Sequence, residues 1–131
     1  MSLQQFIIGE LPQTADLPVY KGDDVEIPLV MEEGEAPNYT PIDITGSTFK
    51  MRIEKKRGAT EVLTITTAGG GIPITDAANG EFKIVLSAAN TTTIYNAEAP
   101  LQYDLQWTKA GGKVKTLLRG DVKTVKDRTP A

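Results

Sequence analysis

Apolar and polar residues alternate along several short stretches of this chain. One such stretch covers residues 101–108, and its apolar members are Leu101, Tyr103, Leu105 and Trp107. Side chains of a β-strand point alternately to opposite faces, so the pattern predicts a half-buried strand with these four residues in the core. The glycines within residues 109–113 can adopt the positive φ angles of a tight turn. We therefore expect a hairpin that returns through residues 114–118.

The same alternation predicts further strands over residues 25–31, 47–56 and 82–87. Residues 61–67 are expected to form another short strand because they are rich in valine, isoleucine and threonine. The side chains expected to face inward from these strands include Phe49, Met51, Phe82 and Ile84. Pro28 cannot donate a ladder hydrogen bond, so it places its strand at a sheet edge or a bulge. Near the end of the chain, Val122 and Val125 break strict alternation, which predicts a bulge close to Gly120.

Glycine and proline residues interrupt the pattern between these strands. Residues 32–46 contain two of each and are expected to form a loop. Asn79-Gly80 is a strong turn signal ahead of the strand at 82–87. Residues 87–95 are the one stretch with helical character, because Ser87 can cap a helix. The threonines of that stretch favour no more than one helical turn.

The chain has 131 residues, which suits one domain with one core. We expect an extended arm over residues 1–16, a single domain over 17–127 and a frayed tail over 128–131. The arm carries an apolar patch formed by Phe6, Ile7 and Ile8. It can pack on its own domain or add as a strand to the sheet edge of a neighbouring subunit.

The spacing of the strands indicates the class of fold. Several short strands, separated by turn signals every 8 to 12 residues or so, are typical of an antiparallel sandwich or barrel, and we favour the sandwich. Tyr103 lies near the start of the penultimate strand, where immunoglobulin-like domains often carry a tyrosine whose hydroxyl bonds to upstream backbone. We therefore predict an all-β, immunoglobulin-like antiparallel β-sandwich of about seven to eight strands with at most one short helical turn.

Composition excludes most catalytic chemistry. The chain has no histidine and no cysteine, which removes the usual zinc sites, Ser-His-Asp and Cys-His nucleophiles and histidine acid–base catalysis. Glu32, Glu33, Glu35 and Asp43 could in principle supply a carboxylate pair for glycoside hydrolysis. An acidic run beside glycine and proline is more typical of a solvated loop. We therefore expect no enzyme activity, no catalytic residues, no cofactor, no metal site and no small-molecule substrate.

Charge and hydropathy limit the classes of partner that the sequence favours. The chain has 14 basic and 17 acidic residues, interspersed along its length, and a net charge of −3. This balance does not favour a nucleic acid or an anionic membrane as partner. No run of 18 apolar residues predicts a membrane span, and the N-terminus lacks the pattern of a signal peptide.

Five short motifs follow one another in an order that resembles a known family. They are Tyr20-Lys-Gly-Asp23, Asp43-Ile-Thr-Gly46, Asn79-Gly80, Tyr103-Asp104-Leu105 and Val114-Lys-Thr116. Over roughly residues 17–127 the chain is similar to the small β-sandwich domains of tailed-phage and prophage virion proteins, in particular the N-terminal domain of baseplate upper proteins. The resemblance implies a non-catalytic module of a tail, baseplate or head-associated assembly. It implies other virion proteins or further copies of the chain as partners, and a location in the virion and, during assembly, in the host cytoplasm.

Two kinds of binding surface follow from these expectations. An assembly module should use the arm with Phe6, Ile7 and Ile8, or the 32–46 segment with Asn38 and Tyr39. The alternative is a carbohydrate-binding β-sandwich on a phage or bacterial surface that uses Asn38, Tyr39 and Tyr95. A glycan binder should offer an exposed aromatic platform in a loop groove, whereas an assembly module should show a large apolar patch or an ordered arm.

Overall fold

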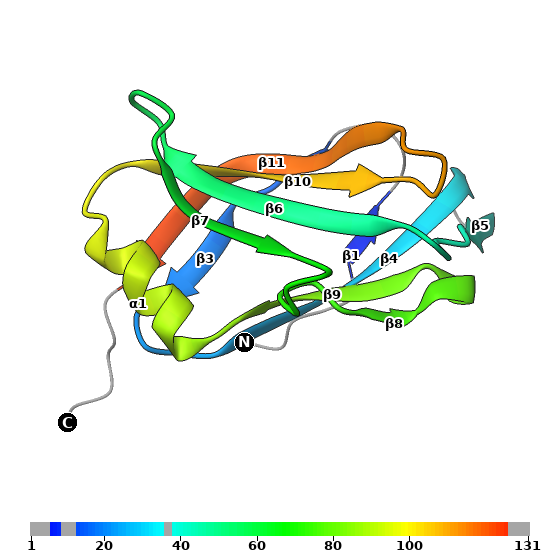
Figure 1. The fold of residues 1–131 in the computed structure, drawn as a ribbon, viewed down its shortest axis with the longest axis horizontal. Helices are drawn as coiled ribbons and strands as arrows, with labels where there is room; N and C mark the ends of the chain where they lie inside the picture. The colour runs from blue at the N-terminus through cyan, green and yellow to red at the C-terminus, as the bar shows by residue number, and fades with distance from the viewer. Residues whose placement is uncertain (1–5, 9–12, 36–37, 126–131) are drawn as a thin grey trace.

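The computed structural model describes residues 6–8, 13–35 and 38–125, and its strands form two sheets packed face to face (Figure 1). The five-stranded sheet contains β1 (Phe6–Ile8), β4 (Val25–Glu35), β5 (Asn38–Pro41), β8 (Ile74–Asp76) and β9 (Glu81–Leu86). The six-stranded sheet contains β2 (Gln13–Thr14), β3 (Leu17–Tyr20), β6 (Thr48–Lys55), β7 (Glu61–Thr66), β10 (Leu101–Thr108) and β11 (Val114–Val125). The helical elements are η1 (Ala77–Asn79), a 3-10 turn, and α1 (Ala88–Asn96).

The order of the strands is that of an immunoglobulin-like sandwich. One sheet runs β1-β4-β9-β8, which is the A-B-E-D order of that fold. The other runs β11-β10-β6-β7, which is the order G-F-C-C′. The predicted all-β, immunoglobulin-like sandwich is therefore confirmed.

The N-terminal segment departs from the antiparallel pattern. Its strand β1 pairs in parallel with β4, whereas β2 and β3 pair in parallel with β11 of the other sheet. All other strand pairs in the described part of the chain are antiparallel. Because this one segment supplies three short strands, the described residues contain more strands than the seven or eight that we predicted. The predicted tail lies outside the described residues.

The core lies between the two sheets and is centred on β10. The residues with inward-facing side chains that the alternation selected, Phe49, Met51, Phe82, Ile84, Tyr103, Leu105 and Trp107, are all buried. Phe49 of β6 and Phe82 of β9 stack across the sandwich, with ring centroids 3.9 Å apart and planes inclined by 13°. This stack joins the two sheets near the middle of the core.

The prediction of a loop over residues 32–46 is wrong for its first part. Strand β4 continues to Glu35 and pairs with β5 in a hairpin at one end of the molecule (Figure 1). Gly34 makes this possible, because it has a φ of +106° and a Cβ there would lie 2.7 Å from the carbonyl oxygen of Asn38. The side chains from Asn38 to Pro41 are exposed, so the sequence has no apolar periodicity from which this hairpin could be predicted.

Helix α1 is longer than the single turn that the sequence predicted. It spans nine residues and begins with a capping box, in which Ser87 and Asn90 each accept a hydrogen bond from the other's backbone N–H. Its buried Thr91 accepts a hydrogen bond from the N–H of Gly22, and its hydroxyl lies 2.9 Å from the carbonyl oxygen of Asp23. Tertiary hydrogen bonds of this kind offset the low helix propensity of threonine.

Replacing Thr91 by valine is expected to lower the free energy of unfolding by about 1–3 kcal/mol, because the N–H of Gly22 and the carbonyl of Asp23 lose their partner. Thr93→Val is the matched control, since Thr93 is exposed and its hydroxyl bonds only to Ala89 of the same helix. Urea denaturation of the two variants measures the difference. Equal losses of stability would show that the contact between α1 and the 22–23 turn contributes little.

The bulge predicted near Gly120 lies elsewhere. The register between β10 and β11 shifts between Leu105 and Gln106, so that Leu117 is the extra residue, and Gly120 pairs regularly with Tyr103. The shift places both Leu117 and Leu118 in the core. Gly120 is required for another reason, because a Cβ there would lie 2.1 Å from the carbonyl oxygen of Ala15.

Candidate functional site

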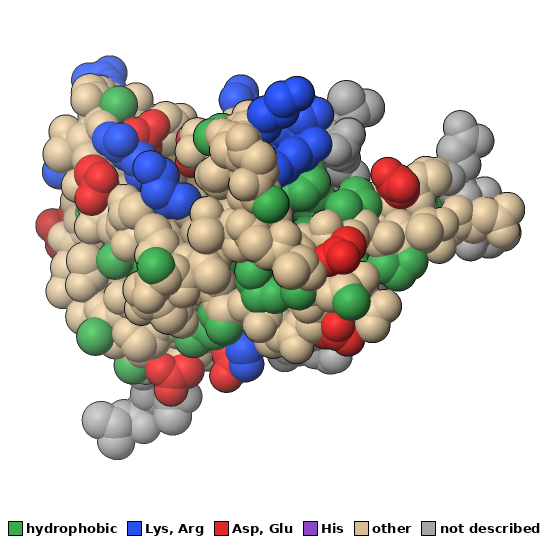
Figure 2. Space-filling view, turned by 45° about the vertical axis from the view of Figure 1, so that its right-hand side comes forward, with side chains coloured by type: hydrophobic (Ala, Val, Ile, Leu, Met, Phe, Trp, Pro, Cys, Tyr) green, Lys and Arg blue, Asp and Glu red, His purple; other side chains and the backbone are tan. Residues whose placement is uncertain are grey.

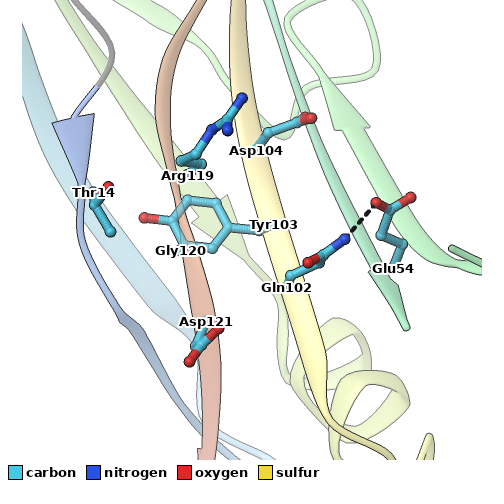
Figure 3. Close-up of a pocket in the computed structure, with 8 residues that line it drawn as sticks. All are labelled: Thr14, Glu54, Gln102, Tyr103, Asp104, Arg119, Gly120 and Asp121. Atoms are coloured by element: carbon cyan, nitrogen blue, oxygen red, sulfur yellow. Dashed lines mark hydrogen bonds between the residues drawn. The ribbon is translucent and has the colours of Figure 1, made fainter. Parts of the chain in front are cut away.

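An open groove of about 340 Å³ lies on the outer face of the six-stranded sheet, beside the N-terminal strands (Figure 3). Its lining comes from β2, β6, β10 and β11 and consists of Thr14, Glu54, Gln102, Tyr103, Asp104, Arg119, Gly120 and Asp121. Gln102 and Asp104 are the outward-facing neighbours of the core residues in β10. Alternation therefore predicts that they face solvent, whereas their position beside Arg119 and Glu54 depends on strand register.

One side of the groove is organised around Glu54. Gln102 Nε2 donates a hydrogen bond of 2.9 Å to Glu54 Oε1, drawn as a dashed line in Figure 3. Arg52 Nε lies 3.1 Å from Glu54 Oε2, within ion-pair distance but without hydrogen-bond geometry. Both partners of this ion pair are partly exposed, so its contribution to stability is small.

Asp104 is another carboxylate that lines the groove (Figure 3). In the sheet register it stands opposite Arg52 of β6 and Arg119 of β11. Partial burial, together with the negative charge of Glu54, raises the pKa of the Asp104 carboxyl, and the nearby basic side chains offset part of this increase. No ion pair within 4.0 Å joins Asp104 to another of the described residues. Its carboxylate is therefore available to a polar group that enters the groove.

The opposite side of the groove is held by ion pairs at Asp121. Lys56 Nζ lies 2.6 Å from Asp121 Oδ1, and Lys123 Nζ lies 3.6 Å from Oδ2. The hydrogen bond from Lys56 is the main cause of the lowered pKa of Asp121. This carboxylate already has cationic partners.

Tyr103 also lines the groove, although its side chain is buried. Its hydroxyl donates a hydrogen bond of 2.6 Å to the carbonyl oxygen of Ala15, between β2 and β3. The sequence predicted a bond to upstream backbone. The acceptor lies 88 residues upstream, whereas in the tyrosine corner of immunoglobulin domains it lies only a few residues away. The tyrosine therefore fastens the N-terminal segment to the sheet.

A stability change at high pH follows from Tyr103. Burial, with a smaller effect of Asp16, raises the pKa of Tyr103 from 10.0 to about 12. The unfolded chain then releases this proton at lower pH than the folded one, so stability should fall as pH rises from about 10 to about 12. Chemical denaturation across this range should show a steeper loss for the native protein than for Tyr103→Phe. Parallel losses would mean that Tyr103 ionises normally in the folded state.

The groove presents polar and charged side chains to a ligand. It offers carboxylates, one amide and one guanidinium, and the tyrosine hydroxyl is already engaged. Within the described ranges no group of three or more carboxylates could hold a metal ion. Ion pairing and hydrogen bonding are the interactions that this arrangement supports.

The interaction residues named from the sequence lie away from the groove. Asn38 and Tyr39 are exposed on the β4–β5 hairpin, and 43% of the Tyr39 surface is accessible. Tyr95 of α1 is half-buried, with Lys21 Nζ 5.2 Å from its ring centroid. The backbone of Phe6, Ile7 and Ile8 forms β1 in its own domain, and their side chains lie outside what the structure describes.

Two other grooves lie along the six-stranded sheet. One involves β7 and the 69–71 glycines, and the other involves Thr108 and Val114 at the far end of the sheet. No exposed aromatic side chain lines either of them or the groove of Figure 3. The aromatic platform expected of a glycan binder is thus missing from these three grooves. Among the described residues, no helix has the length and apolarity needed to cross a membrane.

Comparisons with known proteins found similar solved structures but no sequence relative. No family model and no curated protein sequence matches it. Among solved structures it is similar to murine CRIg, with a TM-score of 0.42, 10% identity, and coverage of 85% of this chain and 92% of that one. It is also similar to a chain in a complex of ICOS with ICOS-L and an anti-ICOS-L VNAR domain. That match has a TM-score of 0.42 and 13% identity, and covers 86% of this chain and 55% of that one. The assignment to the immunoglobulin-like class rests on the strand order, not on these scores.

Proposed function

We propose that this protein is a non-catalytic interaction module of a phage or prophage virion, in a tail, baseplate or head-associated assembly. The observation that carries the proposal is the β4–β5 hairpin, which extends from one end of the sandwich and exposes Tyr39. The order of sequence motifs, which resembles that of virion β-sandwich domains, supports the virion context. The polar groove agrees with a binding role.

The base of the hairpin is held firmly, as a docking element requires. Ile42 N–H donates to the carbonyl of Met31, and Met31 N–H donates to the carbonyl of Gly80. A Cβ at Gly80 would lie 2.6 Å from Met31 O and 2.7 Å from Ile42 O, so only glycine permits this close junction of three backbone segments. A rigid base reduces the entropy that binding would cost.

The proposal is tested on phage particles. After prophage induction, mass spectrometry of purified particles should find the protein, and immunogold labelling should place it on one substructure. Recovery of the protein only in the particle-free fraction would contradict a virion role.

The role of the hairpin is tested in the same particles with Tyr39→Ala. Tyr20→Ala is the matched control, because the two tyrosines are 43% and 42% exposed and Tyr20 lies on β3, away from the hairpin. Incorporation should fall at least several-fold for Tyr39→Ala and stay unchanged for Tyr20→Ala. Equal incorporation of both variants would show that docking uses another surface.

A further inference from the structure

Two protruding hairpins of opposite charge lie at opposite ends of the molecule. The β4–β5 hairpin carries Glu32 and Glu33, and residues 31–49 contain no lysine or arginine. At the other end of the long axis, the β6–β7 turn carries Lys55, Lys56 and Arg57 (Figure 1). Projections of opposite charge at opposite ends are complementary between two copies of the chain.

Several of these charges form no ion pair with any other residue that the structure describes. Within the described residues, neither Glu32 nor Glu33 forms an ion pair. Of the three cations, Lys56 is paired with Asp121. Lys55 and Arg57 form no ion pair in the same part of the chain. Two carboxylates at one end and two cations at the other are therefore available for contacts between molecules.

The basic turn is held in one shape. Gly58 and Ala59 both have positive φ angles, of 79° and 51°, which for alanine is an uncommon conformation. Arg52 Nη2 donates a hydrogen bond of 3.1 Å to the carbonyl of Ala59, and Lys55 N–H donates one of 2.9 Å to that of Thr60. A turn fixed in this way loses little freedom when it docks.

We propose that copies of this chain associate head to tail, with the acidic β4–β5 hairpin of one copy on the basic β6–β7 turn of the next. Tyr39, exposed on the same hairpin, adds apolar contact area. Such a contact joins two different surfaces, so repeated contacts build a ring or a filament rather than a closed dimer. This inference rests on the proposed function, because both use the β4–β5 hairpin as the docking element. The partner here is a second copy of the chain.

A two-fold contact at the acidic end is the competing arrangement. It would bring the carboxylates of two hairpins close together, where like charges repel. The β10–β11 turn at that end also carries lysines, but Lys109 already lies over the Trp107 ring, with Nζ 4.8 Å from the ring centroid. Figure 2 shows basic side chains gathered above the acidic ones on this end of the molecule. The head-to-tail contact avoids the repulsion.

Sedimentation velocity of the full chain tests the proposal. Exposed ion pairs are individually weak and are screened by salt. We expect the average mass to rise with protein concentration at low ionic strength, beyond that of a dimer, and to return to that of a monomer near 0.5 M salt, a concentration at which the screening length falls to about 4 Å.

Charge-reversal variants test whether the β4–β5 hairpin and the β6–β7 turn are the two surfaces in contact. Glu32→Lys/Glu33→Lys should be monomeric, and so should Lys55→Glu/Arg57→Glu, because each variant has like charges at both ends. An equimolar mixture of the two should associate again, since each supplies the charge that the other lacks. Glu98→Lys is the control, because Glu98 is exposed and lies on neither hairpin. Thermal unfolding of every variant confirms that it is folded.

The outcomes separate this inference from the proposed function. A wild-type protein that stays monomeric, forms only a closed dimer, or associates regardless of the reversals would overturn the head-to-tail contact. Particles that contain the chain would still support the virion role in that case, with a different protein as partner. If the protein is absent from particles, but associates at low salt and responds to the charge reversals as described, the virion role is overturned and the self-association stands.

Discussion

Replacing Phe82 by alanine is expected to lower the free energy of unfolding by about 3–5 kcal/mol. Phe82 is 1% exposed and stacks on Phe49 of the opposite sheet, so its removal leaves a cavity between two sheets that cannot collapse onto it without moving apart. Guanidinium denaturation with fluorescence of Trp107 measures the loss. Phe82→Leu keeps most of the volume and should cost clearly less.

A double-mutant cycle with Phe49→Ala isolates the ring contact. Aromatic pairs of this kind contribute about 0.5–1.5 kcal/mol beyond the area that they bury. The losses of unfolding free energy in the two single variants, added together, should therefore exceed the loss in the double variant by about that amount. Strictly additive losses would show that the two rings act only as separate core residues, without a direct coupling between the sheets.

Replacing Gly120 by alanine is expected to lower the free energy of unfolding by about 3 kcal/mol. The new Cβ would lie 2.1 Å from the carbonyl oxygen of Ala15 and 2.8 Å from its carbonyl carbon. These are backbone atoms, so the N-terminal strands must move away from β11. The bond from Ala15 N–H to Arg119 O is then lost, and the buried Tyr103 hydroxyl loses its acceptor.

Gly111→Ala is the control for this variant. Gly111 lies in the β10–β11 turn with an ordinary φ, and a Cβ at this position would have no atom within 4 Å, so alanine should be tolerated there. Hydrogen exchange should show increased exchange of residues 13–20 in Gly120→Ala and no change in Gly111→Ala. Equal protection in both variants would mean that the N-terminal segment adjusts without leaving the sheet.

Much of the fold could be predicted from alternation. Strands β6, β9 and β10 have one apolar and one polar face, and each was predicted within a residue or two of its observed bounds. The β4–β5 ribbon could not be recognised in this way, because the side chains of β5 are exposed on both faces, so no apolar face repeats along it. The length of α1 also escaped prediction, since local propensity is unfavourable and Thr91 gains its hydrogen bonds only from the distant 22–23 turn.

The candidate site was less predictable than the fold. The sequence named Asn38 and Tyr39 as possible interaction residues in a predicted loop, but the groove around Asp104 was missed. Its lining comes from four strands, and two of them, β2 and β6, are far from β10 and β11 in the sequence. An outward-facing Asp104 is predictable from alternation, whereas its neighbours across the sheet depend on the register of β6 and β11.

The sequence by itself determined the class of fold, the inward-facing core residues and the exclusion of histidine- and cysteine-based chemistry. These follow from composition and from a period-two pattern, which are local properties of a chain. Only the tertiary structure decided where Tyr103 finds its acceptor, why position 120 must be glycine and which charged hairpins lie at opposite ends. The physical reason is that these features join segments distant in sequence, and their partners are set by strand register and close packing, which no local pattern encodes.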